Sequence, residues 1–470
     1  MAKKLNRFLA LESEAIVAQN EDGTEGQQSV TTTTDVDVEV STTLPLQQEL
    51  AEIAEDAAEL DEMEEGIEEA EDVQEALESL HAMLGRDATA GGLSQESATY
   101  FQFALERELG RVGLRNTAPS CEAFGVSQSK LRATTLSQES VGTRIKEVWA
   151  MIVKMVTEFL AKVNEFIQTH ISSAGRLVKS AKAVFEKAGK AKGDAKAKEI
   201  AAAGFTKLCD DKGAFPAAGS LLESTQAMLS AAISDGAADG IAALNDLGNV
   251  FSGAKFENND AFLASMGTLY DFYEKHYGAS TVAKYLGGVK AEKGTAGSHE
   301  TRGPVLPGGK QVVFSVVDQP EKDAWKSLDG IRQIIGRINT HNRVVVATTE
   351  PEVKASYDKV PVASIDDCKA IAKAAEAIGS AVVGFKTTNN TLQSAIKKLK
   401  TDADAFAKKA DEAKEMSGQA TSVVETVLKL ANTVCKQSSG FAAAAMRFAV
   451  PTAATALSYA EKSLAQYAAE

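Results

Sequence analysis

The fold class is decided by residues 143–169, TRIKEVWAMIVKMVTEFLAKVNEFIQT. Apolar side chains recur there every three or four residues, which is the spacing that lines one face of an α-helix. The charged side chains of the stretch lie mostly off that face. The stretch therefore predicts one long amphipathic helix, whose apolar stripe consists of Ile145, Val148, Trp149, Ile152, Val156, Phe159, Leu160, Val163, Phe166 and Ile167.

The same periodicity predicts a second long helix over residues 47–84, with a very different polar face. Its apolar positions run from Leu50 to Leu84 at helical spacing. Like charges four residues apart weaken an isolated helix, so this helix is expected to need a partner or counterions. Gly85 and the pair Gly91-Gly92 are expected to end it, and a short helix over 97–109 to follow. The acidic face consists of Glu62, Glu64, Glu65, Glu68, Glu69, Glu71 and Asp72.

The rest of the chain is predicted to be mainly α, as helical bundles with a small two-stranded β insert. Abundant alanine and only 6% aromatic residues favour helices over sandwiches or barrels. The β-branched runs at 311–318 and 343–349 predict the two strands, with a helix over 322–339 between them. Further helices are expected over 365–386, 392–417 and 421–438, and then in an Ala-rich segment that Pro451 interrupts.

The net charge changes sign at a repeated pentapeptide. Leu-Ser-Gln-Glu-Ser occurs at 93–97 (the first copy) and at 136–140 (the second copy). Residues 1–139 carry 9 Lys and Arg against 29 Asp and Glu, a net charge of −20; the other 331 residues carry 41 against 36, a net of +5. A repeated short motif at a charge boundary, in polar flanks expected to be rich in turns, predicts a processing signal for an acidic propeptide.

This organisation has six predicted parts. Residues 19–46 are polar and acidic and are expected to be a disordered spacer. The parts are a targeting segment (1–18), this spacer (19–46), an acidic helical propeptide (47–139), a helical domain (140–290), a loop with a small β/α insert (291–360) and a C-terminal helical domain (361–470).

The sequence offers little for catalysis or for a cofactor. The loop Gly303–Lys310 departs from the phosphate-loop spacing and is better explained as a turn before a strand. The five histidines have no partner at metal-ligand spacing, and the four cysteines are isolated thiols of a reducing compartment. We therefore expect a non-enzymatic protein without a cofactor or metal. No run of about 18 apolar residues and no secretory signal occurs, so the chain is expected to be made in a cytoplasm, without a membrane span.

The stretch 176–207 is basic and could contact the phosphates of DNA. It has few interleaved aromatic residues, so base stacking is not indicated. A solvated helix face is the simpler interpretation, and both remain open. The candidate DNA contacts are Arg176, Lys179, Lys182, Lys187, Lys190, Lys192, Lys196 and Lys198.

The first 170 residues resemble the internal head proteins of large tailed bacteriophages of the phiKZ-like kind. The resemblance rests on the segment FLALESE at residues 8–14, the acidic region, the Ser-x-Glu motifs and the long Trp-containing helix. It implies a structural protein that is packaged inside the head and cut by a prohead protease after the Glu of small-x-Glu motifs. It also implies the capsid shell or other inner-head proteins, and packaged DNA through weak nonspecific contacts, as partners. The implied cleavage residues are Ser137, Gln138, Glu139 and Ser140, with Ser94, Gln95, Glu96 and Ser97 as a second site, while Ala10-Leu11-Glu12 is an extra match.

Two alternatives come from other functional classes. One is a membrane-active helical protein that uses residues 143–169 and the Ala-rich C-terminus to help deliver the genome, which binding to anionic liposomes would favour. The other is an enzyme injected into the host, which a well-formed pocket with converging titratable groups would favour.

Overall fold

The computed structural model describes residues 44–118, 120–124, 127–278, 291–293, 298–318, 322–348, 353–413 and 417–469. The predicted targeting segment and most of the predicted spacer lie outside the described residues. The chain divides into two compact units, which we treat separately. Unit 1 comprises Met1–Glu39 and Ala58–Phe159, and unit 2 comprises Val40–Ala57 and Leu160–Glu470.

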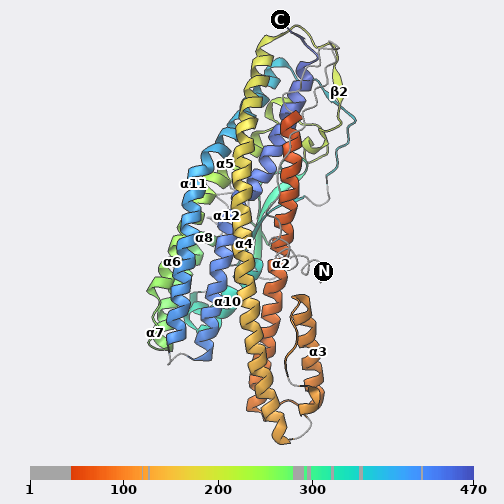
Figure 1. The fold of residues 1–470 in the computed structure, drawn as a ribbon. Helices are drawn as coiled ribbons and strands as arrows, with labels where there is room; N and C mark the ends of the chain where they lie inside the picture. Colours follow the sequence, from red (N-terminus) through yellow and green to blue (C-terminus); the bar gives the residue numbers. More distant parts are fainter. Residues whose placement is uncertain are drawn as a thin grey trace, which may run out of the picture. The chain divides into compact units, whose positions relative to one another are not determined.

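Unit 1 is built from long helices. Helix α2 spans Leu44–Thr89, α3 spans Gln95–Arg111, a 3-10 turn η1 covers Cys121–Phe124, and α4 begins at Ser127. Both predicted helices of this region are confirmed. Helix α2 continues through Gly85, which was expected to help end it, and stops at Thr89, just before Gly91 and Gly92 take positive φ values of 99° and 96°. Within unit 1, α2 and α4 run alongside each other (Figure 1). The fully buried side chains include Ile67, Val73, Leu77 and Leu84 of α2 and Val141, Val148, Ile152 and Val156 of α4.

Helix α4 is much longer than the predicted 143–169, because it spans Ser127–Lys190. The expectation of a turn-rich flank around the second copy is therefore wrong. The physical reason is visible in the sequence: residues 127–141 contain neither Gly nor Pro, so nothing ends the helix there.

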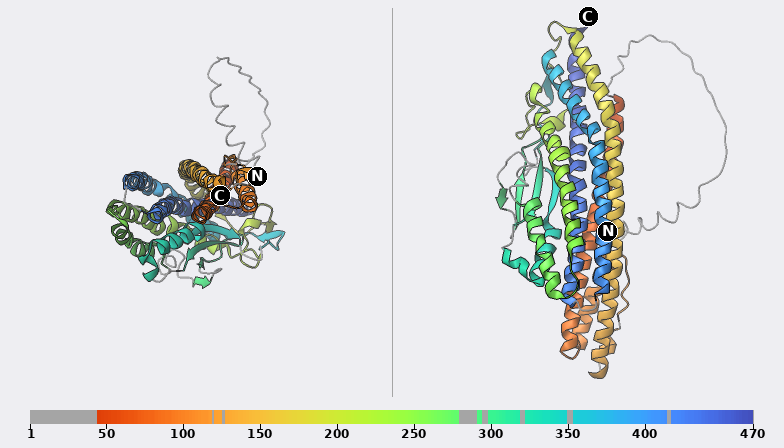
Figure 2. Two further views of the ribbon diagram at one scale, coloured as in Figure 1. Left: turned by 90° about the horizontal axis from the view of Figure 1, so that it is seen from below. Right: turned by 90° about the vertical axis from the view of Figure 1, so that its left-hand side faces the viewer.

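The core of unit 2 is centred on α12 (Gly418–Leu464). This helix packs against α11 (Ile365–Glu412), α6 (Ala237–Gly253) and α10 (Leu328–His341). Figure 2 shows α6, α11 and α12 side by side, with the strands along one side of them. Small residues make this close packing possible; those fully or almost fully buried in α12 include Ala442, Ala445, Ala449, Ala453, Ala456 and Ala460.

Both C-terminal helices are continuous at positions where the sequence predicted a break, because packing holds the backbone helical there. Helix α11 is continuous across residues 387–391, where buried Asn389 donates from Nδ2 to Asn164 Oδ1 at 2.8 Å. Helix α12 continues through Pro451, whose neighbours Val450 and Ala453 are fully buried. Tertiary burial here outweighs the low helix propensity of Asn and Pro.

The two predicted strands are confirmed, and they pair with each other. Strand β5 (Lys310–Val317) lies antiparallel to β6 (Arg343–Thr348), with Val313 opposite Val345. Two strands that the sequence did not indicate, β3 (Ala291–Lys293) and β4 (Ser298–Arg302), extend the sheet in the order β3-β4-β5-β6. Strand β4 has the sequence SHETR, which lacks the apolar alternation by which strands are recognised.

Shorter elements complete unit 2. Helices α5 (Glu223–Ala231), α7 (Asn259–Met266) and α8 (Thr268–Tyr277) lie within residues 140–290, which were predicted to be helical, and a π-helical turn at Ala232–Gly236 joins α5 to α6. Two small antiparallel ladders join distant segments: β1 (Ala191–Lys192) pairs with β8 (Ala468–Ala469), and β2 (Glu199–Ala201) pairs with β7 (Lys359–Pro361).

Candidate processing sites

The first copy of the repeated pentapeptide lies at the start of α3. Ser94 is extended, with φ −70° and ψ 161°, and its hydroxyl caps the helix by accepting from the Ser97 amide at 3.1 Å. Ser94, Gln95, Glu96 and Ser97 are all exposed. The first turn of a helix has amide groups without intrahelical partners and unwinds easily. A protease could therefore reach the Glu96–Ser97 peptide bond by unwinding a single turn.

The second copy lies in the interior of α4 and is only partly exposed. Glu139 is exposed and Ser140 is half-buried, but Ser137 is fully buried. The Ser137 hydroxyl has no hydrogen-bond partner. Ser140 hydrogen-bonds through its hydroxyl to Thr117 at 2.9 Å. The Glu139–Ser140 peptide bond thus lies in regular helix, which a protease cannot bind in the extended form that cleavage requires.

Helix α2 packs against the second copy. A side chain added at Gly85 would lie 3.0 Å from Gln138 Nε2, and one added at Gly142 would lie 3.5 Å from His81 Nε2. Further along, Gly66 lies opposite Met155. These pairs run in opposite directions along the two helices, so α2 and α4 are antiparallel in close contact. Gln138 of the second copy therefore lies against the C-terminal part of α2, next to buried Ser137.

The two copies are also close to each other. The amide of Leu93, the first residue of the first copy, donates to Thr134 Oγ1 at 2.9 Å. Thr134 is fully buried and precedes Ser137 by one turn of α4. The turn at Gly92 approaches the backbone of Lys130 and Leu131 so closely that a side chain at Gly92 would meet it at 2.8 Å. Both glutamates thus lie in one small region of unit 1.

The basic candidates lie at the end of α4 and in the segment after it. Lys179, Lys190 and Lys196 are exposed, whereas Lys187 is half-buried. Lys182 and Lys187 pair with Glu376 and Glu461, at 3.6 Å in each case. These ion pairs reduce the positive charge that the stretch offers to a polyanion, so the surface suits weak contacts at most.

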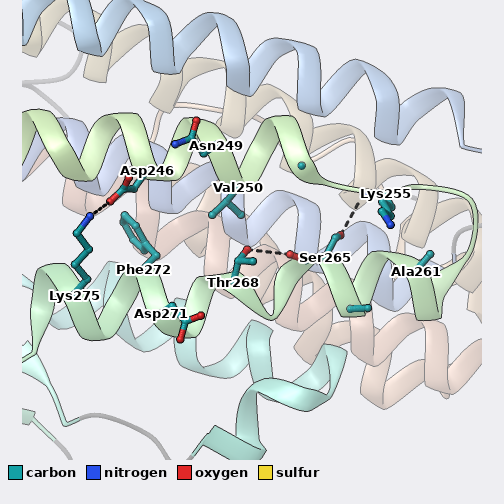
Figure 3. Close-up of a pocket in the computed structure, with 12 residues that line it drawn as sticks. Asp246, Asn249, Val250, Lys255, Ala261, Ser265, Thr268, Asp271, Phe272 and Lys275 are labelled. Atoms are coloured by element: carbon teal, nitrogen blue, oxygen red, sulfur yellow. Dashed lines mark hydrogen bonds and ion pairs between the residues drawn. The ribbon is translucent and has the colours of Figure 1, made fainter.

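A hollow of about 560 Å³ lies between α6, α7 and α8, and Figure 3 shows the side chains that line it. Lys275 Nζ donates to Asp246 Oδ2 at 2.6 Å, and buried His276 contacts Asp246 at 2.9 Å and Asp239 at 3.1 Å. Partial burial alone would raise the pKa of Asp246, but hydrogen bonds from Lys275 and His276 outweigh it and lower the pKa. Lys275 offsets the charge of Asp246, and these contacts join α6 to α8. None of the described residues that line the hollow pairs a nucleophile with a base.

Two buried thiols of the described residues are poor nucleophiles. Burial raises the pKa of the Cys368 and Cys435 thiols to about 12 in each case, which suppresses the reactive thiolate. Among the described residues, no three His, Cys, Asp or Glu side chains are grouped to hold a metal ion. Residues 307–309 form a turn before β5, as expected for the Gly303–Lys310 loop.

Two helical segments of the described chain are long and apolar enough to cross a membrane by length and composition. They are Ala218–Gly253 and Gly418–Leu464. In the second, 67% of the apolar window is buried within the protein. The core helix of a globular protein has the same composition, and α12 lies in the core of unit 2.

Sequence reasoning did not find the burial of Ser137 or the cluster around His276. The unbroken helix over 127–141 could have been read from the absence of Gly and Pro. The packing of α2 against this segment could not have been predicted, because it depends on contacts between residues about 50 positions apart, such as Gly85 and Gln138. Asp239, Asp246 and His276 are likewise brought together only by the packing of α6 on α8.

The chain is mainly α-helical, with an acidic N-terminal region and a near-neutral helical body. The family comparison identifies the particular class: the model of the phiKZ-like phage internal head proteins matches residues 35–462, so this chain belongs to that family. The match includes residues 200–462, where the sequence by itself showed no resemblance. No curated protein and no solved structure matches the chain. The protein is thus a structural protein of the inside of the phage head.

Proposed function

We propose that the protein is made in the host cytoplasm as a precursor, co-assembled into the prohead, and trimmed there by the prohead protease. The main cut falls after Glu139, and a second falls after Glu96. The trimmed body, residues 140–470, then stays with the packaged genome or is ejected alongside it. Its role is structural rather than enzymatic.

The observation that carries this proposal is the repeated pentapeptide at the charge boundary. The second copy separates a region with a net charge of −20 from a region with a net charge of +5. Both candidate glutamates are exposed in the structure, and each is preceded by a small Ser two residues earlier. A protease pocket that reads a carboxylate at the cut and a small side chain nearby fits both copies.

The charge split also supports a role beside DNA. An acidic leader repels DNA and keeps the precursor soluble, and its removal leaves a body that is tolerable next to packaged DNA. The exposed lysines at the end of α4, including Lys179 and Lys190, are the proposed sites of weak nonspecific contact with phosphates. Capsid shell proteins and other inner-head proteins are the remaining proposed partners.

Mass spectrometry of the protein taken from purified virions tests the proposal. Peptides that begin at Ser140, or at Ser97, without a preceding Lys or Arg are the expected result. Abundant intact peptides across residues 20–139 would overturn it, because the acidic region would then belong to the working protein.

A further inference from the structure

We propose that the two cuts are ordered: cleavage after Glu96 comes first and makes cleavage after Glu139 possible. This inference rests on the proposed processing and adds its regulation. Its basis is the unequal environment of the two identical pentapeptides. The first copy is exposed from Ser94 to Ser97, whereas Ser137 of the second copy is fully buried.

The two pentapeptides have the same sequence, so the two sites differ only in their structural surroundings. A protease that reads Ser-Gln-Glu-Ser encounters the same side chains at both sites, so local recognition cannot rank them. The backbone conformation can rank the two sites, because a protease binds several residues of substrate in extended form. At the first copy only the capped first turn of α3 must unwind. At the second copy the interior of a 64-residue helix must open while α2 lies on it.

Helix α2 is the barrier at the second copy. Gln138 lies against Gly85, and the neighbouring pairs Gly142–His81 and Gly66–Met155 continue the contact. Local opening of α4 at Ser137 requires that α2 detach, which exposes buried side chains such as Leu77 and Leu84. As long as α2 is covalently tied to α4 through α3, a detached α2 docks again at once.

The first cut removes this tie. Water adds across the Glu96–Ser97 bond, so that Glu96 acquires a new carboxylate and Ser97 a new amino group. Helix α3 loses its cap, because the Ser94 hydroxyl no longer belongs to the same chain as the Ser97 amide. The Leu93–Thr134 hydrogen bond and the α2–α4 contacts then hold a separate fragment, residues 1–96, in place. Loss of the tether turns an intramolecular contact into a bimolecular one, which favours dissociation of α2.

Four variants test the order in assembling heads, with the products followed over time by mass spectrometry. Glu139→Ala should accumulate residues 97–470. Glu96→Ala should keep the precursor and form little or none of the 140–470 product. Glu106→Ala, which changes another exposed glutamate of α3 in a small-x-Glu match, is the matched control and should be processed normally. The double variant Glu96→Ala/Leu77→Ala, in which α2 is loosened, should form 140–470 again.

The outcomes separate this inference from the proposed function. If Glu96→Ala forms 140–470 at the wild-type rate, the order is wrong while the processing stands. If the Leu77→Ala double variant remains uncut although it folds, α2 is not the barrier, and the inference also fails. If the wild-type chain is cut at neither site, the proposed processing itself is wrong.

Discussion

Truncation of Leu77 offers a quantitative test of the role of α2, because this side chain is fully buried in unit 1. Replacing a buried Leu by Ala costs about 2–5 kcal/mol, since it removes apolar contacts and leaves a cavity. Taking about 3 kcal/mol, with about 1.4 kcal/mol for each factor of ten, the ratio of detached to docked α2 should rise about 100-fold. Leu77 lies on α2 and not in either pentapeptide, so the cleavage sequences are unchanged.

The assay uses a glutamate-specific endopeptidase and the purified full-length chain carrying Glu96→Ala. Exposed Glu106 and Glu122 are changed to Gln in every variant, so that the link between α2 and α4 stays intact. When opening and closing are fast relative to cutting, the cleavage rate follows the population of the open form. The peptide that begins at Ser140 should therefore appear up to about 100-fold faster in the Leu77→Ala variant. Leu247→Ala is the matched control, because Leu247 is equally buried but belongs to α6 in unit 2.

Two results would refute this reasoning. One is a rate change of less than about threefold in a Leu77→Ala protein whose circular dichroism is native, since a loss of 2 kcal/mol already predicts about 30-fold. The other is equal acceleration by Leu247→Ala, which would mean that global unfolding, rather than detachment of α2, exposes the second copy.

Three further predictions follow from single side chains. Ser137→Ala removes a buried hydroxyl without a partner and keeps a small residue, so it should stabilise docked α2 by up to about 1 kcal/mol and slow cutting after Glu139 about fivefold in the same assay. Burial of His170 lowers its pKa from 6.5 to about 4, so the unfolded state binds the proton first as the pH falls. The contribution of neutral His170 to the free energy of unfolding is therefore complete above pH 6.5 and is lost as the pH falls from 6.5 to 4, by at most about 3 kcal/mol. The free energy of unfolding of His170→Leu, measured in urea, should depend less on pH over this range. Replacing exposed Lys179 and Lys190 by Glu should weaken the salt dependence of DNA binding by the trimmed protein. The slope of log K against log salt concentration, measured by fluorescence anisotropy, should become shallower by about two. An unchanged slope would mean that these lysines do not contact DNA.

Local periodicity was a good guide to the helices and a poor guide to their ends. The stripe that includes Val148 and Ile152 predicted part of α4 correctly, because side chains at helical spacing share one buried face. It did not extend the prediction toward Ser127, since the side chains buried there, Ala133, Thr134 and Ser137, are small or polar, while Leu131 and Leu136 are exposed. In α12, Pro451 was expected to break a helix that burial of its neighbours maintains.

The candidate sites show the same division between local and nonlocal information. The pentapeptides, and the change of net charge at the second copy, were visible in the sequence as such. The difference in burial between the two copies was not visible, because it depends on which distant segment covers each copy. Gly85 lies 53 positions from Gln138 in the chain, and no local pattern specifies that they meet.

The acidic face of α2 would make release of the cleaved fragment, as proposed above, hard to reverse. Like charges four residues apart, such as Glu64 with Glu68 and Glu68 with Asp72, weaken α2 as an isolated helix. Docking on α4, and the ion pairs from Arg111 of α3 to Glu69 and Asp72 at 3.5 Å each, offset this weakness in the precursor. After a cut at Glu96, Arg111 remains with the body, while Glu69 and Asp72 leave with the fragment. A fragment that loses its helix on leaving does not dock again readily, because rebinding must first restore the helix. In the proposed processing, the charge that keeps the precursor soluble would thus also favour permanent release of the propeptide, and removal of α2 would not reverse.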